Sequence, residues 1–215
     1  MSDFKVQIKN ARDERETGDA NKALEMFLQI DKSKLDTNNQ LFDYLGELGL
    51  TYWHLKQYKE AKETFEEALK LAEKLNHDSY KAVALRQLSR PELNEGNPDL
   101  AVQFAQEARE LAFASKRQDI VWFDHGVVTA LIFKKASDEE IKNWFDLEAK
   151  DLYEISQYTS DEIAKWVWTC GLLIDRSKVY DTISDLYIAL LIADNFNLAR
   201  RREQIEKLIS EFSKK

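Results

Sequence analysis

Apolar residues recur at helical spacing along nearly the whole chain, and residues 45–69 show the pattern most clearly. In LGELGLTYWHLKQYKEAKETFEEAL, the first half places Leu45, Leu48 and Tyr52 three and four residues apart on one stripe. Such spacing predicts an amphipathic helix. The second half has a stripe of the same kind, formed by Tyr58, Ala61, Phe65 and Ala68. Small residues such as Gly49 let the two helices approach, so the segment is predicted to be a helical hairpin.

This hairpin pattern returns at intervals of 38 to 42 residues. A small or aliphatic residue follows each predicted turn, at Ala23, Ala61, Ala101, Ile141 and Ile183. Four positions further on stand Phe27, Phe65, Ala105, Phe145 and Tyr187. Twelve positions before each of the five stand small residues, namely Ala11, Gly49, Ser89, Thr129 and Gly171. A fixed period of this kind predicts one hairpin design used five times.

The second of these hairpins resembles the tetratricopeptide repeat family. Its residues Leu48-Gly49-x-x-Tyr52, followed by Tyr58, Ala61, Phe65 and Ala68, are similar to the family signature. The fifth hairpin carries a weaker copy in Gly171, Tyr180, Ile183 and Tyr187, and the fourth, which lacks a turn glycine, is included by its spacing. The resemblance covers about residues 4–193. A period near forty, instead of about 34, is similar to the longer-helix branch found in kinesin light chains and in bacterial peptide-sensing regulators.

These patterns predict an all-α fold, a right-handed α-solenoid of five TPR-like helical hairpins plus a C-terminal cap helix. The chain is predicted to be one repeat domain, residues 1–215, because each hairpin of such an array packs only on its neighbours. The predicted repeats are approximately residues 4–36, 38–76, 78–116, 118–158 and 160–193. The cap helix is predicted over 195–213, where Leu198, Ile205, Leu208, Ile209 and Phe212 share one face.

Residues 88–101, LSRPELNEGNPDLA, hold both prolines of the chain. Gly96 and Asn97 followed by Pro98 predict the turn of the third hairpin, with Asn97 as N-cap and Pro98 at the first helical position. Pro91 falls inside the predicted first helix of that hairpin, where its missing N–H is expected to kink or end the helix. The stretch is therefore interpreted as a repeat turn with a nearby helix break, and not as a linker between domains.

The resemblance implies that the first helices of the hairpins line a concave groove. A second stripe on these helices combines aromatic and cationic residues, namely Trp53, Arg86, Arg90, Phe123, Phe133, Lys134, Trp168 and Arg176. We interpret this stripe as the site for a peptide or partner segment that bears carboxylates, since arginines and aromatics dominate such contacts. Arg86 and Arg90, four residues apart, are expected to reach one carboxylate together. The alternative is that some of these aromatics belong to the core.

The alternative function is that of a regulatory or assembly subunit, which docks a larger partner through its outer surface. Some members of the family bind a peptide carboxylate through a set of residues called the carboxylate clamp. This set does not help to choose between the two functions. Its two asparagine positions are similar to Arg12 and Glu47 here, so the clamp pattern fails.

The formal net charge of −8 disfavours binding to nucleic acid or to anionic membranes. The basic run Arg200-Arg201-Arg202 is interpreted as a solvated face of the cap helix, because Glu203 and Glu206 flank it. Cys170 is the single cysteine, so no internal disulfide is expected, and its place on the packing stripe predicts a buried thiol. No long apolar stretch or secretion signal is present, so a cytoplasmic protein is predicted.

Chemistry is not expected of this chain. His54, His77 and His125 are far apart and lack a histidine or cysteine partner at ligand spacing, so no metal site and no cofactor are predicted. Asp124 and His125 are adjacent, but no nucleophile elbow or glycine-rich loop accompanies them. The chain is therefore predicted not to be an enzyme and to have no catalytic residues. The acidic start of residues 138–140 after Ser137 is interpreted as helix capping.

Overall fold

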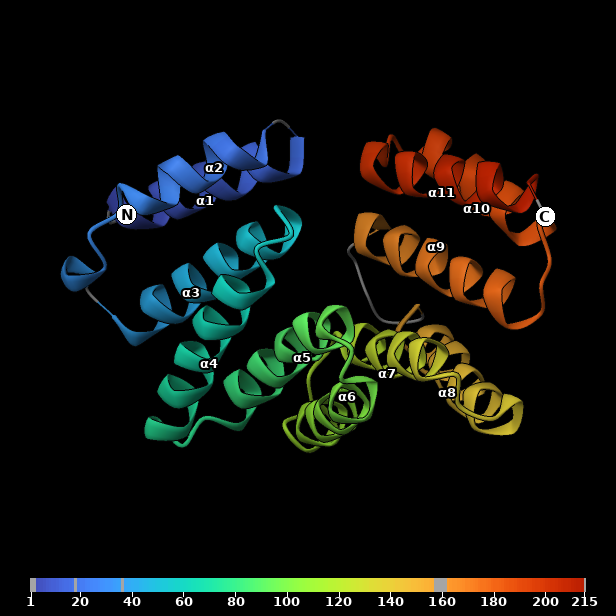
Figure 1. Ribbon diagram of the computed structural model, residues 1–215, viewed down its shortest axis with the longest axis horizontal. Helices are drawn as coiled ribbons and strands as arrows, with labels where there is room; N and C mark the ends of the chain where they lie inside the picture. Colours follow the sequence, from blue (N-terminus) through green and yellow to red (C-terminus); the bar gives the residue numbers. More distant parts are fainter. Residues whose placement is uncertain (1–2, 18, 36, 157–161, 215) are drawn as a thin grey trace. The chain divides into compact units, whose positions relative to one another are not determined.

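The computed structural model describes residues 3–17, 19–35, 37–156 and 162–214, and all regular structure in these ranges is helical. The all-α prediction is confirmed (Figure 1). The helices are α1 (Asp3–Thr17), α2 (Ala20–Leu28), the short 3-10 helix η1 (Lys32–Lys34), α3 (Asn38–His54), α4 (Tyr58–Lys74), α5 (Asp78–Glu95), α6 (Pro98–Ala114), α7 (Ile120–Lys134), α8 (Asp138–Ser156), α9 (Glu162–Val179), α10 (Ser184–Asn195) and α11 (Ala199–Phe212).

Each helix packs against the helix that precedes or follows it in the chain. In addition, α1 contacts α3, α3 contacts α5, and α7 contacts α9. Contacts between every second helix are those of stacked hairpins, in which one hairpin lies on the next. The helix pairs follow the predicted repeats to within two residues, since α1 begins one residue before the first repeat and α10 ends two residues after the fifth. The repeat limits at 36, 158 and 160 lie outside the described residues, as does Gly18.

The chain divides into two compact units, Met1–Arg117 and Gln118–Lys215. The division falls between α6 and α7 and not in the proline-containing stretch. The single domain that the sequence predicts stays a prediction. None of the described helices is long and apolar enough to cross a membrane.

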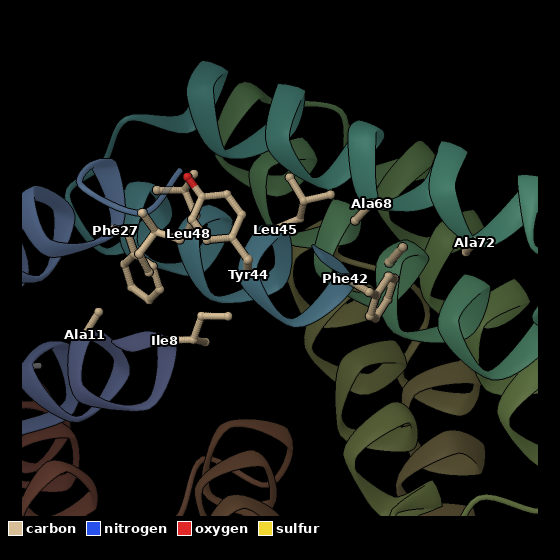
Figure 2. Close-up of a cluster of buried hydrophobic side chains, with 11 residues drawn as sticks. Ile8, Ala11, Phe27, Phe42, Tyr44, Leu45, Leu48, Ala68 and Ala72 are labelled. Carbon is tan, nitrogen blue, oxygen red and sulfur yellow. The ribbon is translucent and has the colours of Figure 1, made fainter. Parts of the chain in front are cut away.

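The core of the first unit is built from alternating large and small side chains on α1 to α5 (Figure 2). The ring of Phe27 meets the ring of Tyr44 edge-on, with centroids 6.2 Å apart. Phe42 stacks on Tyr80 with centroids 4.1 Å apart. Ala68 and Ala72, both on α4, are buried among these larger side chains, so α4 approaches its neighbours closely.

The second unit has its own core. One cluster of this core has the buried members Cys170, Ile174, Leu186, Ala189, Ala193 and Ile205. The apolar face predicted for the cap helix covers this core, because Leu208, Ile209 and Phe212 of α11 pack against it. At the exposed surface of α11, Arg202 pairs with Glu206 at 3.0 Å and with Asp194 at 3.3 Å. The side chain of Arg200 lies outside the described part of α11.

Cys170 supplies a chemical test of this core. Its thiol is buried, its Sγ atom lies 3.6 Å from the carbonyl oxygen of Ala189, and burial raises the pKa of the thiol. A thiol without access to solvent and with a raised pKa reacts slowly. We expect no labelling of the native protein by Ellman's reagent within the time in which the unfolded chain is labelled completely. Fast labelling of the native protein would contradict this packing.

Several of the described helices end in left-handed turns, most of which are not made by glycine. Besides Gly96, the residues with positive φ are Lys56, Asn76, Lys116, Lys135, Asp181 and Asn197. At Lys135 the following N–H, that of Ala136, donates to the carbonyl of Leu131 at 3.1 Å. This six-residue closure satisfies carbonyls that the helix end leaves open. The turn after α7 therefore forms without the glycine whose absence set the fourth hairpin apart in the sequence.

The proline-containing stretch forms a repeat turn, as predicted, but without a helix end at Pro91. Helix α5 continues through the buried Pro91 to Glu95, and Gly96 takes the left-handed conformation with φ of 85°. Pro98 stands at the start of α6, as predicted. Asn97 occupies the N-cap position, but its side chain donates to Glu92 Oε2 at 2.8 Å instead of capping α6. Ser137 caps α8 as expected, since it accepts from the N–H of Glu140 at 3.2 Å.

Candidate functional site

Two of the predicted binding residues meet in the first unit, where α3 packs on α5. The indole Nε1 of Trp53 donates to Asn94 Oδ1 at 2.9 Å. The guanidinium carbon of Arg90 lies 5.3 Å from the centroid of the Trp53 ring, within cation–π range. Trp53 and Arg90 are half-buried and Asn94 is exposed. We call this set of three side chains, Trp53, Arg90 and Asn94, the first-helix face.

Arg86 does not extend this face. It lies one turn before Arg90 on α5, and only 4% of its surface is exposed. Joint binding of one carboxylate by Arg86 and Arg90 requires a guanidinium at the surface, which the buried Arg86 does not offer. Asn94 takes the next place in the same stripe. Sequence reasoning missed it because the helix was expected to be interrupted at Pro91.

Towards the N-terminus, two arginines of α1 form ion pairs with a glutamate of α3. Arg15 Nη2 lies 2.8 Å from Glu47 Oε2, and Arg12 Nη1 lies 3.5 Å from Glu47 Oε1. Arg15 also donates to the carbonyl oxygen of Glu47 at 3.0 Å. Burial and the nearby Glu47 carboxylate raise the pKa of Asp43. A carboxylate of the chain itself thus occupies both arginines, which gives a physical reason why the family's clamp pattern fails here.

The predicted residues of the second unit differ in burial and in their neighbours. Phe123 is fully buried and packs edge-on against Trp122, so its ring offers nothing to a partner. Phe133 and Lys134 are exposed at the end of α7, and Trp168 is half-buried on α9. Arg176 pairs through Nε with Asp185 Oδ2 at 3.1 Å. It lines an open hollow of ≈ 470 Å³ that none of the other predicted residues reaches.

A cluster that the sequence did not predict lies inside the second unit. Nδ1 of His125 on α7 is 2.6 Å from Oδ2 of Asp175 on α9 and 3.6 Å from Oε1 of Glu148 on α8. Both carboxylates are buried, whereas 24% of the His125 side chain is exposed. Burial by itself lowers the pKa of His125, but Asp175 and Glu148 outweigh it and raise the pKa to about 9. Burial likewise opposes the charge on Asp175, and the His125 imidazolium lowers its pKa.

This cluster was not predicted from the sequence because its three residues belong to three different helices. A search for ligand pairs at short spacing cannot find it. A signal was nevertheless present for two of the three, since His125 and Glu148 stand at the places that Leu45 and Ala68 hold in the packing stripes of the second hairpin. Charged residues on a packing stripe are rare unless they are paired with one another.

Comparison with known proteins bears on the repeats directly. Residues 40–112, which run from α3 to α6, match the family model described as Tetratricopeptide repeat. These residues are tetratricopeptide repeats. The matched stretch contains the hairpin signature around Gly49 and the first-helix face. A comparison with curated protein sequences finds no match.

Solved structures of tetratricopeptide repeat type resemble nearly the whole chain. A crystal structure from Podosopora anserina, described as a kinesin light chain with nearly identical TPR-like repeats, has a TM-score of 0.62 at 15% identity over 93% of this chain and 97% of that one. The apo form of RapI has a TM-score of 0.54 at 12% identity, over 91% of this chain and 74% of that one. The predicted TPR-like solenoid is confirmed, and its handedness and number of repeats stay predictions.

Tetratricopeptide repeat folds generally serve as protein-interaction modules, and they are typically non-enzymatic scaffolds. Stacked hairpins present extended surfaces to which a partner can bind without chemistry. The fold therefore indicates a protein partner for this chain. The sequence identity to these solved structures is 15% or lower, so the similarity shows the fold and does not tell which partner binds.

Proposed function

We propose that this chain is a protein-interaction module that binds a peptide or partner segment on the first-helix face. The observation that supports it is the arrangement of Trp53, which is fixed by the hydrogen bond to Asn94 and by Arg90 yet remains partly exposed. A fixed indole loses little conformational entropy when a partner covers it. Tryptophan and arginine are also the side chains that most often dominate binding energies.

The partner segment that suits this face combines an apolar side chain with a neighbouring carboxylate. The apolar group would lie on the indole, and the carboxylate would accept from the Arg90 guanidinium. The net charge of −8 opposes an acidic partner at long range. Recognition of the carboxylate therefore depends on the local position of Arg90. We further propose that the protein acts in the cytoplasm and catalyses no reaction.

A peptide selection with matched variants tests the binding face. Peptides selected from a random phage-displayed library on the wild-type protein would be measured against Trp53→Ala and Phe113→Ala. Phe113 is the matched control, because it is also an exposed aromatic residue beside an arginine but belongs to α6. Arg109 lies 5.1 Å from its ring centroid, and 66% of its surface is exposed. We expect Trp53→Ala to weaken binding about 10-fold or more, because an anchor of this kind contributes over about 1.4 kcal/mol. Phe113→Ala should leave binding unchanged.

The carboxylate is tested with Arg90→Ala and with peptides in which Glu or Asp is replaced by Gln or Asn. Arg90→Ala with the acidic peptide, the wild type with the neutral peptide, and Arg90→Ala with the neutral peptide should all lose the same amount of affinity, because each removes the same single interaction. If Arg90→Ala weakens acidic and neutral peptides equally, the partner's carboxylate has no part in binding. If Phe113→Ala abolishes binding while Trp53→Ala does not, the first-helix face is excluded.

A second candidate is a regulatory or assembly subunit that docks a larger partner through its outer helices. It is favoured by exposed apolar side chains on α10, where Tyr187, Ile188 and Leu191 are each about half exposed or more. Residues 188 and 191 lie three apart on one helix face. In the same selection, a double variant Ile188→Asp/Leu191→Asp that loses all selected peptides, while Trp53→Ala retains them, would establish this second function.

A further inference from the structure

Three ligand-type side chains converge within the second unit. Among the residues that the structure describes, His125, Glu148 and Asp175 form the one group of three such residues that could hold a metal ion. Each offers a donor atom, and the three atoms lie within 4.8 Å of one another. The residues come from α7, α8 and α9, which pack mutually, so the fold itself brings them together.

The spacing of the donors fits a first-row metal ion. Zinc binds imidazole nitrogen and carboxylate oxygen at about 2.0 to 2.2 Å, so donors around a tetrahedral ion lie roughly 3.4 Å apart. The separation of His125 Nδ1 and Glu148 Oε1 is 3.6 Å, and that of His125 Nδ1 and Asp175 Oδ2 is 2.6 Å. Small side-chain rotations would bring all three donors to the required distance without moving a helix.

The inward donor atoms of His125 and Asp175 form an ion pair with each other, so a metal ion would bind between them in place of the imidazole proton. Nδ1 of His125 and Oδ2 of Asp175 approach each other without the alignment of a hydrogen bond, and neither has a hydrogen-bond partner elsewhere in the described residues. The other oxygen of Asp175, Oδ1, accepts from Lys178 Nζ at 3.5 Å. Contacts of this kind orient a metal-binding carboxylate from behind.

We propose that His125, Glu148 and Asp175 bind one divalent first-row transition metal ion of the zinc class. One imidazole and two carboxylates suit such ions, whereas Ca²⁺ takes six to eight oxygen ligands and Cu⁺ prefers sulfur. The partly exposed edge of His125 leaves access for a water molecule as a further ligand. Since the three ligands belong to three helices, the ion would join the fourth predicted hairpin to the first helix of the fifth. The site goes beyond peptide binding and does not depend on it.

A direct titration tests the site. The full chain would be freed of metal with EDTA, dialysed, and titrated with ZnCl2 by calorimetry and with CoCl2 by visible absorption. We expect one equivalent of Zn²⁺ to bind, a Co²⁺ spectrum of a low-coordinate site with nitrogen and oxygen ligands, and a higher thermal midpoint that EDTA reverses. If the folded wild-type chain binds neither ion, the proposal is overturned, and the cluster is a buried ion pair in which protonated His125 serves as the cation.

Variants connect the binding to these residues. Asp175→Asn and His125→Gln should weaken Zn²⁺ binding by more than about 100-fold, the upper range for loss of an outer-shell partner. Asp185→Asn is the matched control, because Asp185 is a buried carboxylate of the same unit that pairs with Arg176. It should bind Zn²⁺ as the wild type does. Unchanged binding by folded Asp175→Asn and His125→Gln would place the ion elsewhere and overturn the assignment. The wild-type Co²⁺ spectrum decides the proposal even if a variant fails to fold.

Discussion

Replacing Gly49 by alanine is expected to lower the free energy of unfolding of the first unit by about 2 kcal/mol. A Cβ atom at Gly49 would contact the Phe65 ring, 2.7 Å from Cδ1 and 2.9 Å from Cζ. The ring is fully buried against Ala61 and Leu88, so it has no room to move away. The overpacking exceeds the gain of up to about 1 kcal/mol that alanine brings to a helix interior.

Gly46 is the matched control for this substitution. It lies on the same helix, and a Cβ atom there meets nothing within 4 Å. Gly46→Ala should therefore stabilise the unit by up to about 1 kcal/mol, which is the difference in helix propensity alone. Urea unfolding followed by circular dichroism measures both variants. Equal effects of the two substitutions would show that the contact between α3 and Phe65 does not limit the approach of the helices.

This contact also explains why the fold could be predicted from the sequence. The close approach of two helices requires a small residue on one of them, and the chain places a small residue twelve positions before each residue that follows a predicted turn, at a nearly constant interval. Gly49 and Phe65 satisfy it most clearly, and the match to the tetratricopeptide repeat model includes both. Four of the five predicted hairpins have an aromatic residue at the place of Phe65 and the third has Ala105, so the pattern can be recognised even where single copies, such as that around Thr129, are weak.

The helix ends were less predictable because their chemistry is not specific to a residue type. Glycine marks a left-handed turn reliably, but lysine and asparagine can adopt the same conformation when the surrounding turn is hydrogen-bonded. Lys135 does so after α7, where no glycine stands. Pro91 shows the converse. Its missing N–H was expected to kink or end the helix, but α5 continues to Glu95, and Pro91 and its neighbours on α5 are buried.

The candidate sites depend on which face of a helix is buried, and this is where sequence reasoning fails first. Trp53 and Arg90 were predicted together because hairpins in register place the same stripe side by side. Arg86 shares that stripe with Arg90, yet it is buried, and so is Phe123 on α7. A stripe position gives the angle around one helix, whereas exposure depends on the neighbouring helices. The cluster around His125 depends on three such neighbours at once, so only the folded chain reveals it.

Replacing Lys62 by methionine is expected to destabilise the first unit by about 2 to 3 kcal/mol, close to the cost of leaving a buried charge without its partner. Lys62 Nζ on α4 lies 2.6 Å from Glu92 Oε1 on α5, and the Glu92 side chain is 1% exposed. The hydrogen bond from Asn97 to the other Glu92 oxygen would remain, and Lys62 is 29% exposed, so the effect should stay below the upper limit for such pairs.

Lys59→Met is the control that separates burial from charge. Lys59 lies 4.0 Å from Glu63, with the two side chains 82% and 66% exposed, so its loss should change stability by less than about 0.5 kcal/mol.

The hydrogen bond to Glu92 raises the pKa of Lys62 above its ordinary 10.5. Because this pKa is raised in the folded state, the contribution of the pair is complete below pH 10.5 and is lost as the pH rises further. The difference in unfolding free energy between wild type and Lys62→Met should therefore be constant from neutral pH up to that value and shrink above it. A difference that shrinks instead well below that pH would show that another group, and not Lys62, neutralises Glu92.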